Sequence, residues 1–551
     1  MRDYREAYES FSMAALEQET LSGGLSSGVN ACIECCDRWA SADKTALHWV
    51  SRDLTRHDVS FADLRRDAAR FANLLRSRGI GPGDVVAGLL PKVPELLTVI
   101  LGTWRAGAIY QALFTAFGPD AIASRMTGPG GSGAKLVVTD AINRPKLDQV
   151  PHCPPALMID RGAPGATAFA TEMAAQADLF QPVMRLGHDP FIMIYTSGTT
   201  GSPKGVRMPH AALLQFAESM HLGFGVAESD TFWCMADPGW ALGLYLGVTG
   251  PLLIGKPVVL YDGPFTVDST VRVIAELGVT NFVTAPTALR LMRAAGDAAV
   301  APIAHRLRVI SAGGEAVSPE IVRWANATLH CPVHEVWGQT EMGVTTYNHV
   351  GLRQENRIGS VGTASRGFAF AILNDELNPV PDGEVGVMAV DRARSPLFFF
   401  DGYWRTTNQP IHGNWYLTGD TMQRDGEGYY HFVGRNDDLI TSSGYRIGPS
   451  DIEDTILSHP SVAEVAVVGR PDPERTEIVK AFVVLRAGWE ASDALVGQYQ
   501  QLVRERLAAH AYPREVAFMS ELPKTPSGKV QRFVLRRMET PARVSSPDRQ
   551  R

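Results

Sequence analysis

Cysteine, long apolar runs and an excess of positive charge are all scarce in this chain of 551 residues. Its 6 cysteines are too few for the disulfide framework of a small secreted domain, and the chain can bury a core without disulfides. Cys32, Cys35 and Cys36 cluster, but no second pair stands at metal-ligand spacing. We therefore expect these residues to be buried thiols on a helix, in a protein of a reducing compartment such as the cytoplasm.

The charge balance argues against nucleic acid as a partner. Lys and Arg number 52 against 59 Asp and Glu, which gives a net charge of -7, and bulk nucleic-acid binding needs concentrated positive charge. Hydrophobic residues make up 45% and charged residues 20%, a mixture that excludes wholesale disorder, collagen and coiled coil. A local basic pocket for a phosphate-bearing ligand remains compatible with this composition.

One uncharged run, residues 238–255, reaches the lower length limit for a transmembrane helix. It contains five glycines and two prolines, so a buried helix beside a pocket is the better prediction, and we expect no transmembrane segment. The first residues, MRDYREAYESF, are charged and lack the apolar stretch of a targeting signal.

Strand-like and helix-like segments alternate over more than half of the chain. The region from Asp58 to Gly79 predicts a helix that begins at Ser60 and Asp63, an S-x-x-D pair, and stops at Gly79. Further helices are predicted at 95–106, 271–277 and 319–327, and strands at 85–90, 136–139, 191–196, 257–262, 282–286 and 307–311. Because these strands are nearly continuous apolar runs, they should be parallel and covered on both faces, which indicates an α/β fold of large layered sheets.

The pattern changes twice towards the C-terminus. After Gly359, short segments with Gly and Pro turns predict a small, antiparallel, β-barrel-like part. From Asp437 a compact α+β unit follows, with helices at 449–457 and 494–509 and strands at 462–468, 478–485 and near 516. We predict two domains, 1–436 and 437–551, and expect residues 540–551 to fray.

Two segments contain clustered glycines. Gly128, Gly130 and Gly133 form a G-x-G-x-x-G string, but a dinucleotide-binding loop follows a strand and opens a helix, and the order here is reversed. We therefore predict a surface loop there.

The second segment, TSGTTGSPKG, follows an apolar strand. Its small residues let the backbone approach an anion, its N–H groups and hydroxyls can donate to phosphate oxygens, and Lys204 adds a point charge. It is not a Walker A loop, because Lys204 precedes its glycine, and a flexible Ser/Gly loop is the alternative. The predicted phosphate-binding residues are Thr196, Ser197, Gly198, Thr199, Thr200, Gly201, Ser202, Pro203 and Lys204.

This segment and six further motifs, in this order, resemble the adenylate-forming (AMP-binding) superfamily of acyl- and aryl-CoA synthetases, peptide-synthetase adenylation domains and luciferases. The further motifs are AGGEAV from Ala312, EVWGQTEMG from Glu335, YLTGD from Tyr416, GRNDDLI from Gly434, SSGYRIGPSDIE from Ser442 and PKTPSGKVQR from Pro523. Within the superfamily the chain most resembles medium-chain acyl-CoA synthetases, with acetyl-CoA synthetase a near neighbour.

The resemblance implies an AMP-forming acid–thiol ligase with ATP, CoA and a carboxylic acid as substrates. Lys529 would bridge the acid's carboxylate and the α-phosphate as the catalytic lysine, assisted by Thr340 and Lys204, and acetylation of Lys529 would abolish this charge. Glu341 would bind the Mg²⁺ that accompanies ATP. The other implied ATP-binding residues are Gly314, Glu315, Ala316, Glu335, Val336, Trp337, Gly338, Gln339, Asp420, Arg435 and Arg446.

The same resemblance implies a second state for thioester formation. Asp437 matches the hinge about which the small domain would rotate, withdrawing Lys529. The implied CoA-binding residues are Ser443, Gly444, Tyr445, Arg475, Tyr512, Pro513 and Arg514.

The acid pocket implied by the resemblance consists of Trp240, Ala241, Leu242, Gly313 and Gly338. Acetate-specific relatives carry a tryptophan at the position of Gly338, so its absence here implies space for a larger acid, and Gly338→Trp is expected to favour acetate. Because none of the five residues is Lys or Arg, a second carboxylate would be buried without a partner. We expect an uncharged short- or medium-chain, branched or small aryl acid.

Two other classes of function remain open. An adenylating enzyme could load a separate carrier protein; a fused carrier is not expected, since the chain ends soon after Lys529. A nucleotide-binding protein without catalysis is expected to have lost Lys529, Glu341 or Asp420, and all three are present.

Overall fold

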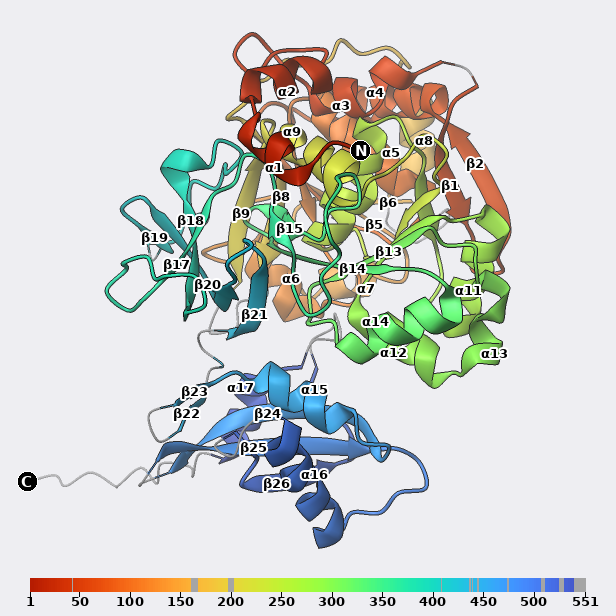
Figure 1. Cartoon of the computed structure of the whole chain (residues 1–551). Coiled ribbons are helices and arrows are strands. Elements are labelled where there is room, and N and C mark those ends of the chain that lie inside the picture. The colour runs from red at the N-terminus through yellow and green to blue at the C-terminus, as the bar shows by residue number, and fades with distance from the viewer. Residues whose placement is uncertain are drawn as a thin grey trace, which may run out of the picture. The chain divides into compact units, whose positions relative to one another are not determined.

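The computed structural model describes residues 1–41, 43–159, 167–196, 203–407, 409–435, 438, 440–442, 445–472, 475–506, 511–524 and 530–539 (Figure 1). The chain divides into two compact units. Unit 1 comprises Met1–Ala371, Ala389–Leu417 and Glu427–Tyr430, and unit 2 comprises Ile372–Met388, Thr418–Gly426 and His431–Arg551.

A seven-stranded sheet in unit 1 has the order β7-β6-β5-β3-β4-β8-β9. The pairs from β7 to β8 are parallel, and only the edge strand β9 runs antiparallel to its neighbour. Its strands are β3 Val85–Leu89, β4 Ile109–Ala112, β5 Leu136–Thr139, β6 Ala156–Met158, β7 Thr167–Ala168, β8 Pro190–Thr196 and β9 Lys204–Pro209.

A six-stranded sheet of unit 1 has the order β10-β12-β13-β14-β15-β16, with its first four strands parallel. One face, which includes Trp233, Phe282 and Ile310, packs on buried side chains of helices α11 (Val267–Leu277), α12 (Pro286–Ala294) and α14 (Pro319–Trp324). Its strands are β10 Phe232–Cys234, β12 Asn281–Thr284, β13 Val309–Gly313, β14 Val333–Gln339, β15 Gly343–Tyr347 and β16 Thr363–Ala364. A three-stranded sheet consists of β1 Thr45–Val50, β2 Arg56–Ser60 and β11 Val258–Tyr261.

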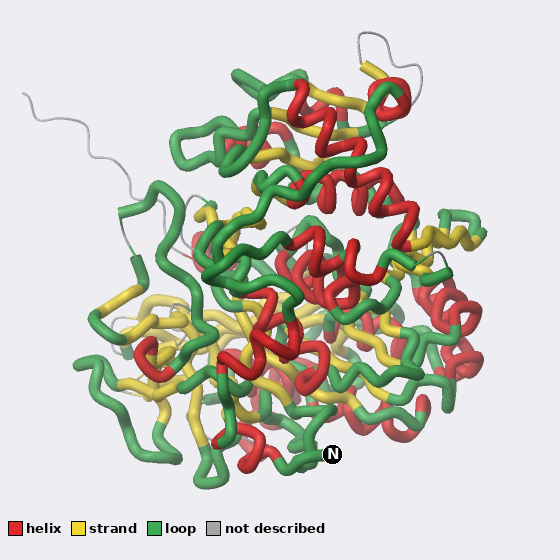
Figure 2. The backbone as a smooth tube through the Cα atoms, turned by 90° about the horizontal axis from the view of Figure 1, so that it is seen from above, coloured by secondary structure: helices red, strands yellow, loops and turns green. Residues whose placement is uncertain are grey.

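The helices of unit 1 flank these sheets (Figure 2). Helix α4 begins where the sequence predicts: Ser60 and Asp63 form a capping box, and Gly79 follows its end at φ +70°. The helices are α1 Tyr4–Glu9, α2 Met13–Thr20, α3 Ala31–Cys35, α4 Phe61–Ser77, α5 Pro94–Arg105, α6 Pro119–Met126, α7 Arg144–Leu147, α8 Phe169–Ala174, α9 Ala212–Glu218, α10 Gly250–Leu253, α11 Val267–Leu277, α12 Pro286–Ala294, α13 Asp297–Val300 and α14 Pro319–Trp324. Segments of 3₁₀ or π helix are η1 Asp37–Trp39, η2 Ser219–Gly223, η3 Gly243–Thr249, η4 Ala301–Ile303, η5 Ala325–Leu329 and η6 Arg392–Arg394.

A further sheet, in the order β17-β18-β20-β19 with β21 beside β20, contains strands through which the division between the units passes. Its strands are β17 Phe370–Leu373, β18 Val385–Asp391, β19 Ile411–His412, β20 Trp415–Arg424 and β21 Tyr430–Arg435.

The rest of unit 2 is an α+β structure around its own hydrophobic core, to which Ile440, Ile452, Val467 and Tyr499 contribute. Its sheet has the order β23-β22-β25-β24, with β26 parallel to β25. Its elements are β22 Ile440–Ser442, β23 Tyr445–Ile447, α15 Pro449–Leu457, β24 Val462–Asp472, β25 Thr476–Leu485, α16 Asp493–Arg506, β26 Glu515–Met519 and α17 Arg532–Glu539.

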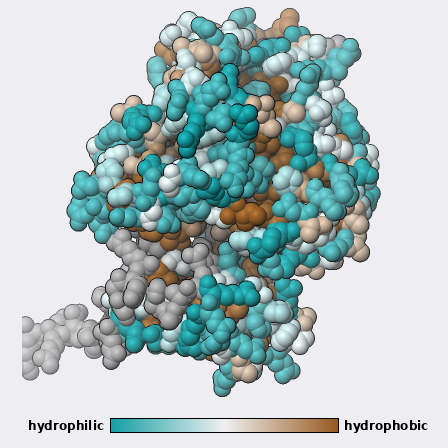
Figure 3. Space-filling model, viewed as in Figure 1, coloured by the Kyte–Doolittle hydropathy of each residue, from teal (hydrophilic) through white to brown (hydrophobic). Residues whose placement is uncertain are grey.

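The expected fold class is confirmed: mainly parallel layered sheets, a curled antiparallel part and a C-terminal α+β structure. The uncharged run forms η3 and α10, both buried, and among the described residues no helix is long and apolar enough to cross a membrane. Cys32, Cys35 and Cys36 are buried on or directly after α3, as predicted. On the face seen in Figure 3 most residues are hydrophilic, and hydrophobic residues gather in one area of the larger unit.

Helices α4 and α5 make close contact at Gly102. A Cβ at this position would lie 2.7 Å from Phe71 Cβ and 2.9 Å from Ala68 O, whereas a Cβ at Gly81 would meet nothing within 4 Å. Gly102→Ala is therefore expected to lower the free energy of unfolding by about 1–3 kcal/mol, because the helices must separate. Gly81→Ala should change it by less than about 0.5 kcal/mol. Thermal melts of both variants test this, and equal midpoints would contradict the packing argument.

Candidate active site

Strands β8 and β9 form the hairpin that carries the predicted phosphate-binding segment. They pair antiparallel, with Tyr195 opposite Gly205 and Thr196 opposite Lys204. The hairpin therefore brings the first and last predicted phosphate-binding residues side by side at the edge of the seven-stranded sheet. Pro203 directly precedes β9.

The glycine-rich loop at 128–133 lies between α6 and β5, in the helix–loop–strand order that the sequence predicts. Its carbonyl oxygens accept hydrogen bonds from side chains at the hairpin. The Tyr195 hydroxyl donates to Gly130 O at 2.9 Å, and Trp404 Nε1 donates to Gly131 O at 3.2 Å. The loop therefore has a structural role: its backbone carbonyls accept hydrogen bonds that support the hairpin.

Lys204, Tyr403 and Glu341 meet beside the hairpin. The Lys204 ammonium lies 4.9 Å from the centroid of the Tyr403 ring, and the Tyr403 hydroxyl donates a hydrogen bond to Glu341 Oε1 at 2.6 Å. Among the described residues no carboxylate forms an ion pair with Lys204. The ammonium is thus stabilised by an aromatic face that leaves its charge available to an anion.

Glu341 has the chemistry of a magnesium ligand. Its side chain lies in the turn between β14 and β15, it is 7% exposed, and a hydrogen bond orients its carboxylate. The described residues contain no cluster of three or more His, Cys, Asp and Glu that could hold a metal alone. Mg²⁺ is commonly bound by one or two carboxylates together with substrate phosphates and water, so a single buried carboxylate fits it.

The loop after β13 is held by charged side chains. Glu315 accepts hydrogen bonds from Arg290 at 2.6 Å and Thr287 at 2.8 Å, both on α12. Glu335 accepts a hydrogen bond from the backbone N–H of Val317 at 3.1 Å. These two carboxylates therefore shape the loop that contains Gly314 (φ +87°) and Ala316.

Strand β14 and the following turn contain the EVWGQTE motif. The Trp337 ring lies edge-on to Phe370, with 6.2 Å between ring centroids. Gln339 accepts a hydrogen bond from the Tyr416 hydroxyl at 2.9 Å, and the Thr340 carbonyl accepts one from Tyr245 at 3.1 Å. Val336 directly precedes Trp337 on β14 and is buried.

Asp420 and Arg435, the two predicted ribose contacts, lie together in unit 2. Arg435 Nη1 is 3.1 Å from Asp420 Oδ1, and the Asp420 side chain is 5% exposed. They come from adjacent strands, β20 and β21. A carboxylate oriented in this way can accept hydrogen bonds from two hydroxyls of a sugar.

Two arginines contact Tyr512 in unit 2, and the charge of a third, Arg475, acts on it. Arg504 and Arg514 lie 3.8 Å and 5.1 Å from its ring centroid, and Arg514 Nη1 donates to its hydroxyl at 3.0 Å. The hydrogen bond from Arg504, together with the charges of Arg514, Arg504 and Arg475, lowers the pKa of Tyr512. Arg504, on α16, is absent from the sequence prediction, while Arg475, Tyr512, Pro513 and Arg514 belong to it.

Several predicted site residues lie outside the described residues. They are Ser197, Gly198, Thr199, Thr200, Gly201, Ser202, Asp437, Ser443, Gly444 and Lys529. For Tyr445 and Arg446, the backbone is described as part of β23 and the side chains are not.

The predicted acid pocket contains one large aromatic wall and two glycines. Trp240 packs against Phe114 and Phe117, with ring centroids 5.5 Å and 5.4 Å away. A Cβ at Gly313 would lie 2.5 Å from Val336 O. Ala241 and Leu242 directly precede η3.

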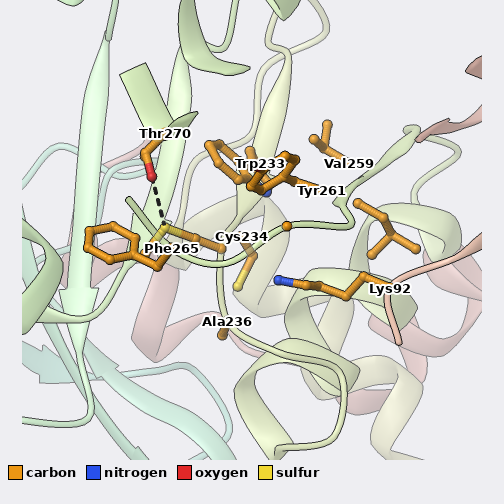
Figure 4. A pocket seen from close by; sticks show the side chains of 11 residues that line it. Lys92, Trp233, Cys234, Ala236, Val259, Tyr261, Phe265 and Thr270 are labelled. Atoms are coloured by element: carbon orange, nitrogen blue, oxygen red, sulfur yellow. Dashed lines mark hydrogen bonds between the residues drawn. The ribbon is translucent and has the colours of Figure 1, made fainter. Parts of the chain in front are cut away.

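A separate cavity of about 90 Å³ lies at the ends of β10 and β11, and none of the five predicted acid-pocket residues lines it. The Lys92 side chain points into it towards Cys234 (Figure 4). Burial raises the pKa of Cys234 to about 12, so its thiol is protonated at neutral pH. The lining residues are Lys92, Trp233, Cys234, Met235, Ala236, Val259, Leu260, Tyr261, Gly263, Phe265 and Thr270.

Two protein-family models match the sequence of this chain. The AMP-binding enzyme model matches residues 36–404, and the AMP-binding enzyme C-terminal domain model matches residues 451–529. The chain belongs to the AMP-binding enzyme family. The resemblance inferred from the seven motifs is thereby confirmed.

Proteins similar to this chain indicate which reaction within the family it catalyses. The acetyl-coenzyme A synthetase of Bacillus subtilis is 34% identical, with 98% of this chain and 95% of the relative covered. The crystal structure of the Brucella canis acyl-CoA synthetase is 48% identical with a TM-score of 0.80, over 98% of this chain and 99% of the other. A benzoate CoA ligase from Burkholderia xenovorans is 28% identical with a TM-score of 0.80, over 92% and 100%.

The chain is therefore an AMP-forming CoA ligase of the acyl- and acetyl-CoA synthetase group. Members of this group depend on ATP, generally with Mg²⁺, and take CoA as co-substrate. The relatives named above are all CoA synthetases or CoA ligases, and they give no support to the carrier-protein alternative.

The expectation that a tryptophan at position 338 would simply fill a pocket is wrong for this backbone. A Cβ at Gly338 would lie against Gly343 O and Val344 Cα, closer than real Cβ contacts, because β14 and β15 pair there with a shift in register. The space beside Gly338 is occupied by the backbone of the neighbouring strand.

Gly338→Trp is consequently expected to lower stability and to reduce turnover of every acid, rather than to create an acetate enzyme. Even Gly338→Ala should cost about 1–3 kcal/mol, since β15 must move. Thermal melts and assays with acetate and longer acids measure both effects. A Gly338→Trp enzyme that is as stable as the parent and prefers acetate would contradict this assignment.

Proposed function

We propose that this chain joins an uncharged carboxylic acid larger than acetate to CoA through an acyl-AMP intermediate. First, a carboxylate oxygen attacks the α-phosphorus of ATP, and the bond to pyrophosphate breaks. Next, the CoA sulfur attacks the carbonyl carbon, the bond from that carbon to the AMP oxygen breaks, and the thiol proton is released. The protein supplies position and charge, with no covalent nucleophile.

The arrangement of Lys204, Tyr403 and Glu341 is the observation that carries this proposal. It supplies one available ammonium and one oriented carboxylate at the end of a hairpin whose sequence suits polyphosphate. Lys204 would bind the phosphates that leave as pyrophosphate, and the Thr340 hydroxyl would donate to the α-phosphate. Lys529 would neutralise charge between the acid and the α-phosphate.

Glu341 would hold Mg²⁺, with phosphate oxygens and water as the remaining ligands. The bound ion supplies positive charge that offsets the negative charge of the phosphates. The oriented carboxylate of Glu341 is this chain's contribution, since a hydrogen bond already holds it.

The nucleoside of ATP would be held by residues from several elements. Trp337 and the Gly314–Ala316 loop would border adenine, Asp420 would accept from the ribose hydroxyls, and Arg435 would lie beside it. Arg446 would contact the phosphates during adenylation. The ion pair between Arg435 and Asp420 supports the ribose role, because it orients the carboxylate.

For CoA we propose a site on the C-terminal domain. Arginine groups suit phosphates, and Arg504 and Arg514, which both contact Tyr512, bring positive charge together in unit 2, with the charge of Arg475 also acting on Tyr512. Residues 443–445 would line the path of the pantetheine arm. We further propose that the chain is organised as domains 1–436 and 437–551, with rotation at Asp437 exchanging Lys529 for this CoA site between half-reactions.

The choice of acid rests on the chemistry of the proposed pocket. None of its five residues carries a positive charge, so a second carboxylate on the acid would be costly to bury. Trp240, held between Phe114 and Phe117, offers an apolar wall that suits an alkyl or aryl group.

Release of AMP, measured acid by acid with ATP and CoA present, tests this function. Butyrate, longer or branched acids and benzoate are expected to have a higher kcat/KM than acetate. Each methylene that the pocket buries should lower the activation free energy behind kcat/KM by about 1–3 kcal/mol. Dicarboxylates should be poor substrates. Omission of CoA serves as the control, because turnover should then stop after acyl-AMP. A preference for acetate would overturn the proposed acid.

The CoA site gives a matched pair of variants on α16. Arg504→Ala removes a guanidinium that lies 3.8 Å from the Tyr512 ring and should raise the KM for CoA about tenfold, with the KM for ATP unchanged. Arg506→Ala removes an exposed guanidinium that bonds only weakly to Ser458, at 3.3 Å, and should leave both constants unchanged. Equal KM values for CoA in the two variants would contradict this site.

A further inference from the structure

Tyr403 contacts both charged groups of the proposed phosphate site. Its hydroxyl donates to Glu341 Oε1 at 2.6 Å, and its ring centroid lies 4.9 Å from Lys204 Nζ. A hydrogen bond from a hydroxyl to a carboxylate at this length is of the strong, charge-assisted kind. One side chain thus touches the carboxylate proposed for Mg²⁺ and the ammonium proposed for phosphate.

The backbone holds Tyr403 independently of Glu341. Gln409 bonds to it on both sides: Tyr403 N donates to Gln409 Oε1 at 2.6 Å, and Gln409 Nε2 donates to Tyr403 O at 3.2 Å. Gly402, at φ +126°, lies so close to Gln409 that a Cβ would be 2.9 Å from its Oε1. The position of the Tyr403 backbone is therefore set by contacts within its own loop.

The same loop is attached to the phosphate hairpin. Trp404 N donates to Gly205 O at 2.8 Å, one residue after Lys204. Arg207 on β9 forms an ion pair with Asp401 at 3.0 Å. These bonds on both sides of Tyr403 keep its ring over the start of β9.

The opposite charges of Lys204 and Glu341 explain why a tyrosine in contact with both would matter. An ammonium and a carboxylate on the same ring would attract each other, and a direct ion pair would occupy both with one another. Among the described residues Lys204 forms no such ion pair, and the tyrosine contacts both groups, the ammonium with its ring and the carboxylate with its hydroxyl. A neutral donor holds the carboxylate and an aromatic face holds the ammonium, so each keeps its charge.

We propose that Tyr403 is a positioning residue that prevents a Lys204–Glu341 ion pair, so that Glu341 stays available to Mg²⁺ and Lys204 to phosphate. This role rests on the proposed function, because it assumes that ATP binds at this hairpin. It differs from a merely structural role in one respect: it predicts separate changes in metal affinity and in phosphate affinity.

The hydroxyl and the ring can be tested separately with a non-hydrolysable ATP analogue and Mn²⁺ as the metal probe. Tyr403→Phe keeps the ring and should weaken Mn²⁺ binding to the enzyme–nucleotide complex by roughly tenfold to a hundredfold. Its affinity for pyrophosphate in the presence of EDTA should stay unchanged. Tyr429→Phe, which removes a hydroxyl that donates to Glu355 O at 2.9 Å, is the matched control and should change neither affinity.

Removal of the ring tests the ion pair itself. Tyr403→Leu should weaken both Mn²⁺ binding and metal-free pyrophosphate binding, because Lys204 and Glu341 can then pair. Adding Glu341→Gln to Tyr403→Leu should restore metal-free pyrophosphate binding, since the ammonium loses its competitor. A protein that has only lost structure would show no such rescue.

The outcomes separate the two claims. If the parent enzyme binds no nucleotide or pyrophosphate, the proposed function itself fails. If the parent binds them but Tyr403→Phe binds Mn²⁺ as tightly as the parent, or the double variant shows no rescue, the positioning role is overturned. Electron paramagnetic resonance of free Mn²⁺ and calorimetric titration of pyrophosphate give these affinities without any measurement of turnover.

Discussion

The antiparallel pairing of β8 with β9 determines where the charges of the phosphate site can lie. It brings Thr196 opposite Lys204 at the edge of a sheet whose other pairs are parallel. Gly205 lets the neighbouring side chains approach this point closely, because a Cβ would lie 3.0 Å from the Tyr195 ring and 3.1 Å from Trp404 Cβ. The glycine loop at 128–133 and the segment around Tyr403 both attach to this hairpin.

At two places in the proposed site an aromatic ring contacts charged groups that the proposal assigns to phosphate or metal binding. Tyr403 contacts an ammonium and a carboxylate, and in unit 2 Tyr512 contacts arginines that lower its pKa. Such arrangements leave net charge available to ligands, which a reaction between polyanions requires, because the phosphates must be neutralised only when they are bound.

Much of the fold follows from local sequence signals, since they act within one element. The capping box at Ser60, the apolar parallel strands and the reversed order around Gly128 are of this kind. Tyr403 escaped prediction because its partner Glu341 is 62 residues away and no motif joins them. Arg504 resembles any exposed arginine on a helix until the fold brings Tyr512 beside it. At Gly338 the missing side chain indicated space, yet the register of β14 and β15 fills that space with backbone.

Transfer of oxygen from the acid to AMP tests the central claim most directly, that this chain activates a carboxylic acid as acyl-AMP before it forms the thioester. The acid is labelled with ¹⁸O in both carboxyl oxygens, and the products of one turnover with ATP and CoA are analysed by mass spectrometry. The account predicts one ¹⁸O in AMP and one in the thioester, because the oxygen that attacks the α-phosphorus leaves with AMP. Unlabelled AMP, with ¹⁸O in phosphate or pyrophosphate, would contradict it.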